Sequence, residues 1–402
     1  MAKVAEILKN PRIFAGLLVL IVCGLLFVRY PLKAFSPQSA GAPGDFTVYL
    51  RASDRLAQGV SPYVSSDSSP YKYSPALAGM TSCIPHEQAW FLFSALSILG
   101  FGAALFFGGA YRSFKSVALL AVGYSLAWKG VLETLDYGQI DFVLFILGVF
   151  AARWVIEKPF WAGFVVGCLP AIKLPWLLMI APFQVESLTD AGENPKRVLL
   201  KRRRIFLSGV ALALLTWLVV LPLLFWGPMR AWDLTYDWIL LLAKGQPSSL
   251  FLSDINQSIG LLVWRLTGHE LSVSLSAVMG GGVALFLGFW ILHMRKLNPV
   301  SPRKFPLAWL APWLLLIQLV SPLSWRWASL FAAAIPLAIV RGEPKTEWFK
   351  RWAALWVSVL ILWILQLNPV ARALGFEAWT DFHGWGLITV YWIALVLISV
   401  SE

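Results

Sequence analysis

Long apolar runs recur along the whole chain, and they restrict its possible folds more than any other feature. The first run, Ile13 to Val28, contains no charged residue, and further runs follow as far as residue 400. A helix needs about 20 mostly apolar residues to cross a bilayer, and several runs approach or exceed that length. Hydrophobic residues make up 58% of the chain and charged residues only 13%. A soluble fold could not bury so much apolar surface, so the sequence predicts an all-α polytopic membrane protein.

Basic residues cluster between the apolar runs, and their positions predict the topology. Lys3, Lys9 and Arg12 precede the first run, which has no small-residue cleavage site after it and should be retained as a span. The later cation-rich connections are 111–115, 153–158, 196–204, 295–304 and 341–351. Because cytoplasmic loops carry an excess of lysine and arginine, we expect these connections and both termini to be cytoplasmic. The net charge of +12 therefore requires no nucleic acid as a partner.

This topology predicts about eleven to thirteen membrane helices in a single transmembrane domain, residues 1–402. The expected spans, besides the first, are 89–110, 117–134, 140–155, 205–226, 272–293, 306–320, 327–340, 351–367 and 384–400. Two large loops, 30–88 and 227–271, are then extracytoplasmic.

The segment around residues 160–183 does not fit a simple crossing, because cation-rich connections flank it on both sides. Pro170 and Pro175 lie on either side of Lys173 at its centre. Proline breaks a helix interior, and irregular backbone at membrane depth is tolerated only against protein or a polar cavity. We therefore expect a broken-helix hairpin with Lys173 at its tip, facing an anionic partner. The alternative is a lysine that extends to the interface from an ordinary span.

Polar side chains gather on the expected extracytoplasmic side. They are Asp45, Tyr49, Lys72, Gln139, Asn256, Gln257, Trp325 and Arg326. A sugar donor linked to a lipid phosphate requires such a combination, because cations stabilise a departing phosphate and a carboxylate can accept the proton of an attacking hydroxyl. Displacement by one carboxylate without a covalent intermediate inverts the anomeric carbon. The histidines and the three widely separated cysteines show no metal-ligand spacing, so no metal and no other cofactor is expected.

Six stretches, in order, resemble glycosyltransferase family 87, whose members are integral membrane enzymes of the GT-C fold. They are GDFTVYLRASDRLAQGVSPY, PYKYSPALAGM, DYGQIDFVLFILG, AGFVVGCLPAIKLPWLLMIAPF, DINQSIGLL and LVSPLSWRWASLFAAAIPL. The resemblance covers roughly residues 40 to 340 and implies a GT-C-type fold with an active site that faces away from the cytoplasm. By resemblance, Asp45 is the general base.

The family includes polyprenol-phosphate-mannose-dependent mannosyltransferases. The resemblance therefore implies a hexosyltransferase of a bacterial inner membrane that moves mannose from a polyprenyl-phosphate donor to an extracytoplasmic glycolipid or polysaccharide. The alternatives are another sugar on the same carrier, such as arabinose or glucose, and a transporter or flippase of lipid-linked sugars. A third is a non-catalytic scaffold of envelope assembly, in which Asp45 would only cap a helix.

The expected roles follow from these chemistries. Lys173, Arg326 and Lys72 are assigned to the donor phosphate. The residues assigned to the sugar or acceptor are Tyr49, Gln139, Asn256, Gln257 and Trp325. Arg326 stands where the family commonly has a histidine, and a guanidinium can bind phosphate but cannot exchange a proton.

Several of these residues also have a purely structural interpretation. Asp45 could cap the following helix, and so could Asn256. Asp141 could complement a helix dipole, an interpretation that we favour over catalysis for this residue. Lys72 could anchor its loop at the lipid headgroups. Tyr49 should share the face of Asp45 on the following helix, whereas Arg51 should point elsewhere.

Overall fold

The computed structural model describes residues 10–31, 44–64, 70–108, 117, 121, 130–185, 195–244, 261–263, 273–297, 302 and 306–320. All regular structure in these ranges is helical, as the sequence predicts. The chain divides into two compact units. Unit 1 comprises residues 1–108, 132–184 and 190–245, and unit 2 comprises 109–131, 185–189 and 246–402.

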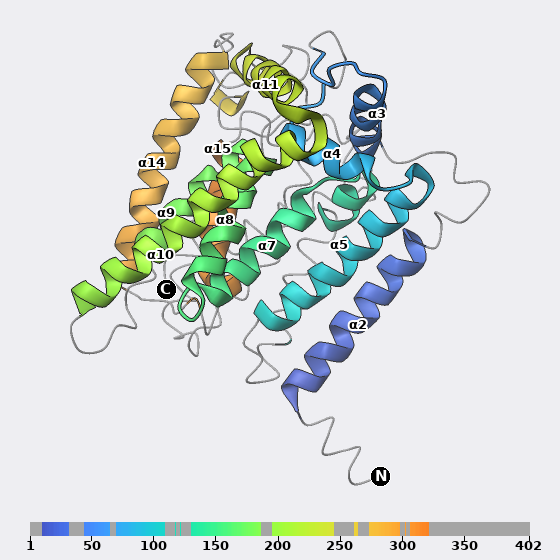
Figure 1. Ribbon diagram of the computed structural model, residues 1–402. Helices are drawn as coiled ribbons and strands as arrows, with labels where there is room; N and C mark the ends of the chain where they lie inside the picture. Colours follow the sequence, from blue (N-terminus) through green and yellow to red (C-terminus); the bar gives the residue numbers. More distant parts are fainter. Residues whose placement is uncertain are drawn as a thin grey trace. The chain divides into compact units, whose positions relative to one another are not determined.

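The helices of unit 1 are drawn from blue to yellow-green in Figure 1. They are α2 (Pro11–Arg29), α3 (Phe46–Ala57), α4 (Pro75–Ser82), α5 (His86–Gly108), α7 (Asp141–Trp154), α8 (Pro159–Ile172), the 3-10 helix η2 (Leu174–Met179), α9 (Ile180–Val185), α10 (Pro195–Leu215), the π-helical turn η3 (Thr216–Val220) and α11 (Leu221–Lys244). Unit 2 contains α14 (Val273–Leu297) and α15 (Pro306–Val320). Proline occupies the first position of α2, α4 and α8, where its missing amide hydrogen costs no helical hydrogen bond.

Within the described ranges, three helical segments are long and apolar enough to cross a membrane: Pro11–Arg29, Gln88–Gly108 and Leu200–Leu242. The helices α2, α5, α7, α14 and α15 coincide within a few residues with predicted spans. The span predicted at 205–226 instead belongs to a helix that begins at Pro195, inside the cationic cluster, because lysine and arginine are themselves good helix formers. The spans predicted beyond residue 320, and most of the one at 117–134, lie outside the described residues.

Helices α8 and α10 pack unusually closely through three glycines. Gly163 and Gly167 of α8 are separated by one helical turn, and a methyl group at Gly163 would overlap the carbonyl oxygen of Phe206 in α10. Gly209 of α10 likewise lies against the carbonyl oxygen of Phe160. Small residues four apart allow membrane helices to approach backbone to backbone, so this seam fixes α8 firmly in unit 1.

The predicted break lies at Lys173. Helix α8 ends at Ile172, Lys173 is extended (φ −141°, ψ 106°), and η2 starts at the next residue. Pro175 is in the first turn of η2, where proline is well tolerated, whereas Pro170 lies inside the last turn of α8 and does not end it. The broken helix expected around residues 160–183 is thereby confirmed, with the break one residue beyond the end of α8.

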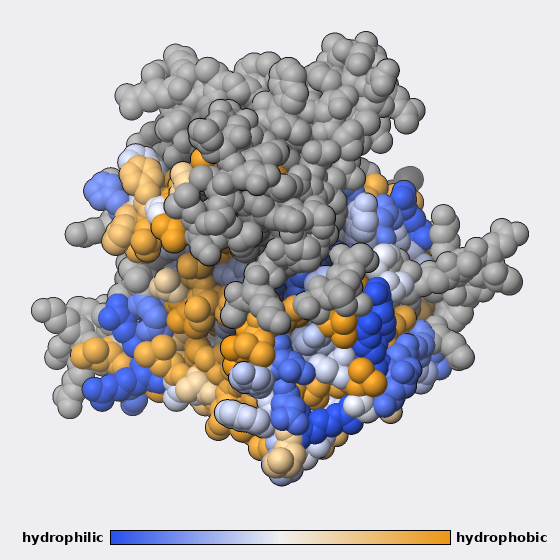
Figure 2. Space-filling view, turned by 90° about the horizontal axis from the view of Figure 1, so that it is seen from above, coloured by the Kyte–Doolittle hydropathy of each residue, from blue (hydrophilic) through white to orange (hydrophobic). Residues whose placement is uncertain are grey.

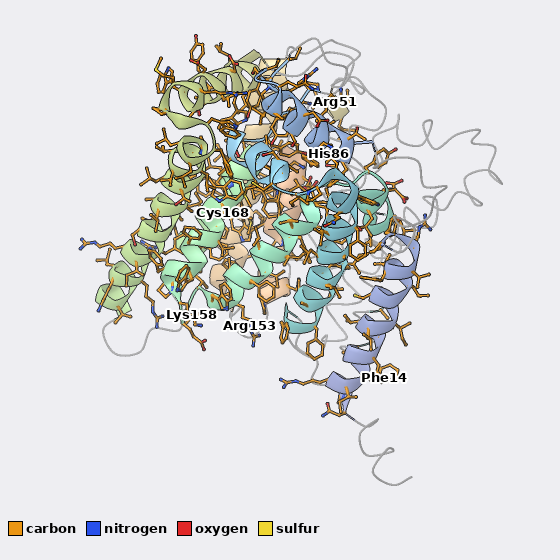
Figure 3. All side chains as sticks on the ribbon, turned by 45° about the vertical axis from the view of Figure 1, so that its right-hand side comes forward. Phe14, Arg51, His86, Arg153, Lys158 and Cys168 are labelled. Carbon is orange, nitrogen blue, oxygen red and sulfur yellow. The ribbon has the colours of Figure 1, made fainter. Side chains whose placement is uncertain are left out.

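The two ends of unit 1 differ in the residues that they carry. Figure 3 shows Phe14, Arg153 and Lys158 at one end and Arg51 and His86 at the other. The first group contains residues predicted to lie at the cytoplasmic side, and the second belongs to the predicted first extracytoplasmic loop. The two sets of residues therefore lie at opposite ends of the helices, and the assignment of one end to the cytoplasm stays a prediction from the basic connections.

Candidate active site

A tight turn brings Gln139 next to the start of α3. The helical residues 132–136 end in a turn where the Gln139 amide donates to the Thr134 carbonyl at 2.9 Å. Gly138 adopts a positive φ of 67°, which a glycine tolerates without strain. A methyl group at this position would also lie 2.6 Å from the Cβ of Phe46, so only glycine fits between the turn and α3. The turn in the stretch DYGQID is therefore what places the Gln139 side chain.

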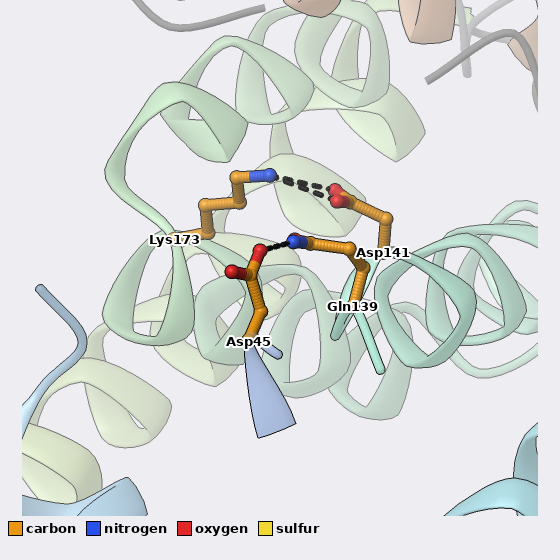
Figure 4. Close-up of polar contacts among 4 residues, drawn as sticks. All are labelled: Asp45, Gln139, Asp141 and Lys173. Atoms are coloured by element: carbon orange, nitrogen blue, oxygen red, sulfur yellow. Dashed lines mark hydrogen bonds and ion pairs between the residues drawn. The ribbon is translucent and has the colours of Figure 1, made fainter. Parts of the chain in front are cut away.

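Asp45 immediately precedes α3, and its side chain faces this turn. Its amide donates to the Tyr137 carbonyl at 3.2 Å. Although Asp45 occupies the N-cap position, its carboxylate makes no capping hydrogen bond. Instead, the Nε2 of Gln139 donates to an Asp45 carboxylate oxygen (Figure 4). The capping role considered for Asp45 is therefore not the one that its side chain performs.

A second polar pair lies beside the first. The Nζ of Lys173 donates to both carboxylate oxygens of Asp141, each at 2.9 Å (Figure 4). The Asp141 side chain is only 2% exposed, whereas that of Lys173 is 21% exposed. An ammonium has three donors, so Lys173 can bond to both oxygens of Asp141 and retain one donor for a further contact. The anionic partner that Lys173 requires is a residue of this chain.

Lys72 adds a second cation to this neighbourhood. Burial raises the pKa of Asp45 to about 6, an effect opposed by the charges of Lys173 and Lys72 and reinforced by that of Asp141. Burial also lowers the pKa of Lys72 to about 8, which the charge of Asp45 partly offsets. The four groups carry two charges of each sign, so the site is close to neutral when all are ionised. We refer to Asp45, Lys72, Asp141 and Lys173 as the charge cluster.

Four tyrosines pack together beside the charge cluster, and two of them, Tyr49 and Tyr73, lie near the charges of Asp45 and Asp141. The rings of Tyr49, Tyr63, Tyr71 and Tyr73 are in mutual contact, with neighbouring centroids 5.0–6.4 Å apart. Burial raises the pKa of Tyr49 well above its ordinary value, so its hydroxyl stays protonated. That hydroxyl is buried beside the Tyr73 hydroxyl, with which it interacts, and it lies near the charges of Asp45 and Asp141. A phenol hydroxyl can both donate and accept, so a ligand hydroxyl could also bond to this pair.

Other polar residues of the first loop have structural roles instead. Asp54 pairs with His86 at 3.5 Å on the surface, and Arg51 is exposed, as its position on α3 predicts. Asp136 accepts a hydrogen bond of 2.7 Å from the Tyr30 hydroxyl and lies 3.7 Å from the guanidinium of Arg29. These contacts attach α2 to the helical turns before Gly138.

The remaining candidates cannot be located in this way. Asn256, Gln257, Trp325 and Arg326 lie outside the described residues. Among the residues that are described, no three histidine, cysteine, aspartate or glutamate side chains lie together in a geometry that could hold a metal ion.

Asp141 is the site residue that sequence reasoning did not assign. Its position at the start of the apolar run of α7 suggested only a contribution to the helix dipole. A signal was nevertheless present, because a lysine within an apolar segment needs a buried counter-charge. Asp141 is the acid that directly starts an apolar run in the same part of the sequence.

Comparison with known proteins identifies the family of the chain. No curated protein matches the sequence. A family model for glycosyltransferase family 87 matches residues 75–322, which is more than half of the chain. The matched region contains Gln139, Asp141 and Lys173, whereas Asp45, Tyr49 and Lys72 precede it. The chain therefore belongs to glycosyltransferase family 87 and is a glycosyltransferase with an all-α, polytopic membrane fold.

Proposed function

We propose that the enzyme transfers a hexose, with mannose as the first candidate, from a polyprenyl-phosphate donor to a hydroxyl of an extracytoplasmic glycolipid or polysaccharide. The observation that carries the proposal is the Asp45 carboxylate, which makes no capping bond and lies in the charge cluster with two lysines. Asp141 and Lys173 stand at the ends of α7 and α8 opposite those that carry Arg153 and Lys158, which supports an extracytoplasmic reaction at a bacterial inner membrane.

The chemistry assigned to Asp45 is general-base catalysis. An acceptor hydroxyl attacks the anomeric carbon, forming a new carbon–oxygen bond, while the bond from that carbon to the phosphate oxygen breaks. Asp45 takes the hydroxyl proton, and the polyprenyl phosphate leaves with the bonding electron pair. A base whose pKa lies near 6 is largely ionised at neutral pH and retains useful basicity. Because no covalent intermediate forms, the anomeric configuration inverts.

The lysines have a different task in this reaction. A phosphodiester donor carries one negative charge, and the polyprenyl phosphate gains more charge as it departs. Lys173 and Lys72 can stabilise that charge as it develops, in a setting from which water is largely excluded. Asp141 keeps the Lys173 ammonium in place before the donor arrives. Gln139 orients the Asp45 carboxylate, and Tyr49 lies near enough to Asp45 and Asp141 to contact a sugar hydroxyl bound there.

The proposal is tested with purified protein, radiolabelled polyprenyl-phosphate sugars and extracted envelope lipids. We expect Asp45→Asn to abolish transfer, because an amide cannot accept the proton. Asp54→Asn is the matched control, since Asp54 lies on the same helix but on the surface and pairs with His86. Transfer retained by Asp45→Asn would refute the base assignment. Absence of transfer with every donor, together with movement of lipid-linked sugar across vesicles, would favour a flippase.

A further inference from the structure

The helical segment Leu200–Leu242 is too long for one membrane crossing. It contains 43 residues and has the hydropathy of a membrane span. At 1.5 Å per residue it would extend about 65 Å, roughly twice the thickness of the hydrocarbon core. The cationic residues 196–204 mark the end that we assign to the cytoplasm. About 20 residues beyond them suffice for the crossing, which leaves the portion after residue 226 unaccounted for.

The helix breaks at the place where that crossing should end. Gly227 has non-helical angles, φ 72° and ψ 173°, inside α11, and Pro228 follows it. Just before the break, Phe225 and Trp226 pack against Gly79 of α4, where a methyl group would clash with both rings. The change of direction at Gly227 is therefore built into the packing of unit 1. Figure 1 shows the second part of α11 at the same end as α3.

One face of residues 228–244 is attached to the extracytoplasmic part of unit 1. Trp238 donates from its Nε1 to the Lys72 carbonyl at 2.9 Å, and Ser61 donates to Asp237 at 2.7 Å. Arg230 donates to the Leu56 carbonyl at 2.8 Å. The apolar side chains that this face buries are Ala231, Leu234, Trp238 and Leu241. The segment is thus held on the loop that carries a cation of the charge cluster.

The opposite face of the same segment carries an exposed apolar stripe, with the exposed Asp233 beside it. Met229 is 80% exposed, Trp232 73%, Tyr236 55% and Ile239 54%. Their spacing of three, four and three residues puts them in one stripe along the helix. An exposed apolar stripe of this length is unfavourable in water. Viewed from this end, the described surface exposes hydrophobic patches beside hydrophilic ones (Figure 2).

We propose that residues 228–244 lie along the extracytoplasmic surface of the bilayer, with Met229, Trp232, Tyr236 and Ile239 inserted at the boundary between headgroups and acyl chains. Lipid is the expected occupant because exposed apolar side chains also mark the end of the crossing itself, where Leu223 and Leu224 precede the break by a few residues. Tryptophan and tyrosine are also the side chains that favour this boundary.

This placement has a direct consequence for the site. Because Trp238 binds the main chain of Lys72, the depth of the helix in the lipid sets the height of that lysine above the membrane. The phosphate of any lipid-linked substrate lies in the same headgroup layer. The placement of this helix depends on the membrane topology and not on the identity of the sugar. It can therefore be wrong while the proposed transfer reaction is right, and the transfer reaction can be wrong while the placement is right.

Spin labelling in proteoliposomes tests the proposal. Cys83, which is exposed, is first replaced by serine. Nitroxides are then attached singly to Trp232→Cys and Tyr236→Cys, with Arg51→Cys on α3 as the control expected to face water. We expect the ratio of collisions with oxygen to collisions with an aqueous nickel chelate to be several-fold higher at 232 and 236 than at 51. Equal ratios at the three positions would overturn the proposal. Protection of 232 and 236 from both reagents would also overturn it, since it would mean that protein covers the stripe.

Discussion

The hydrogen bond from Gln139 to Asp45 makes a quantitative prediction about pH. With a pKa of about 6, Asp45 is half ionised at pH 6, about nine-tenths ionised at pH 7 and about one-tenth at pH 5. We expect kcat/KM for transfer to fall on the acidic side with the same midpoint. The amide of Gln139 donates to the ionised carboxylate and so favours the charged form.

Gln139→Met removes that donor while keeping a side chain of similar length. A hydrogen bond to a charged group contributes about 1.5–3 kcal/mol, and one pKa unit corresponds to about 1.36 kcal/mol. The acidic midpoint should therefore rise by about one to two units. At pH 6, kcat/KM should drop about 5-fold to 50-fold, and near pH 9 it should recover towards the wild-type value.

The measurement is the pH profile of kcat/KM between pH 5 and 9, with purified protein and a labelled polyprenyl-phosphate sugar. Gln58→Met is the control, because Gln58 is exposed at the end of α3 and its loss should leave the midpoint near 6. A Gln139→Met profile that overlays the wild type, or one that falls equally at every pH, would refute the role of this hydrogen bond.

Three further substitutions probe other parts of unit 1. Asp141→Asn removes the carboxylate that Lys173 contacts directly and should lower the unfolding temperature, at a cost below the 3–5 kcal/mol of a fully buried pair because Lys173 is 21% exposed. It should also raise KM for the donor, and an unchanged KM would contradict the placement of Lys173. Gly163→Leu should destabilise the protein by more than about 1–3 kcal/mol in thermal unfolding, because the new side chain would overlap α10. Gly24→Leu is the control and should be tolerated, because no atom lies within 4 Å of a Cβ placed at that position. Tyr49→Phe removes a buried hydroxyl that interacts with the Tyr73 hydroxyl, so it should lower stability by about 0.5–1.5 kcal/mol in the same assay. An unchanged KM for the donor and the acceptor alike would exclude a substrate contact.

The break at Lys173 could be predicted because its causes are local. Proline and an isolated lysine in an apolar run are visible in the sequence, and each has a strong effect on a helix in lipid. The burial of Tyr49 and the exposure of Arg51 were predictable for the same reason, since helical spacing alone determines which of them shares the face of Asp45.

The partners of these residues could not be predicted, because they depend on contacts between distant segments. Gln139 lies 94 residues from Asp45, and Asp141 lies 32 residues from Lys173. Asp45 has the sequence context of a helix cap, and only the close approach of Gly138 to Phe46 shows why its side chain turns to Gln139 instead. The extent of α10 was also underestimated, because hydropathy detects the part of a helix in lipid and not its charged extension.

The glycine seam between α8 and α10 has a mechanical consequence for Lys173. Lys173 follows Gly163 by about ten residues, which corresponds to about 15 Å along α8. A rotation of about 4° about the seam would carry the lysine through about 1 Å, and an error of that size in an active site can cost on the order of 100-fold in rate. The packing of Gly163 and Gly167 against α10 therefore sets the position of Lys173. A small substitution at the seam that leaves the unfolding temperature unchanged should therefore still lower kcat measurably.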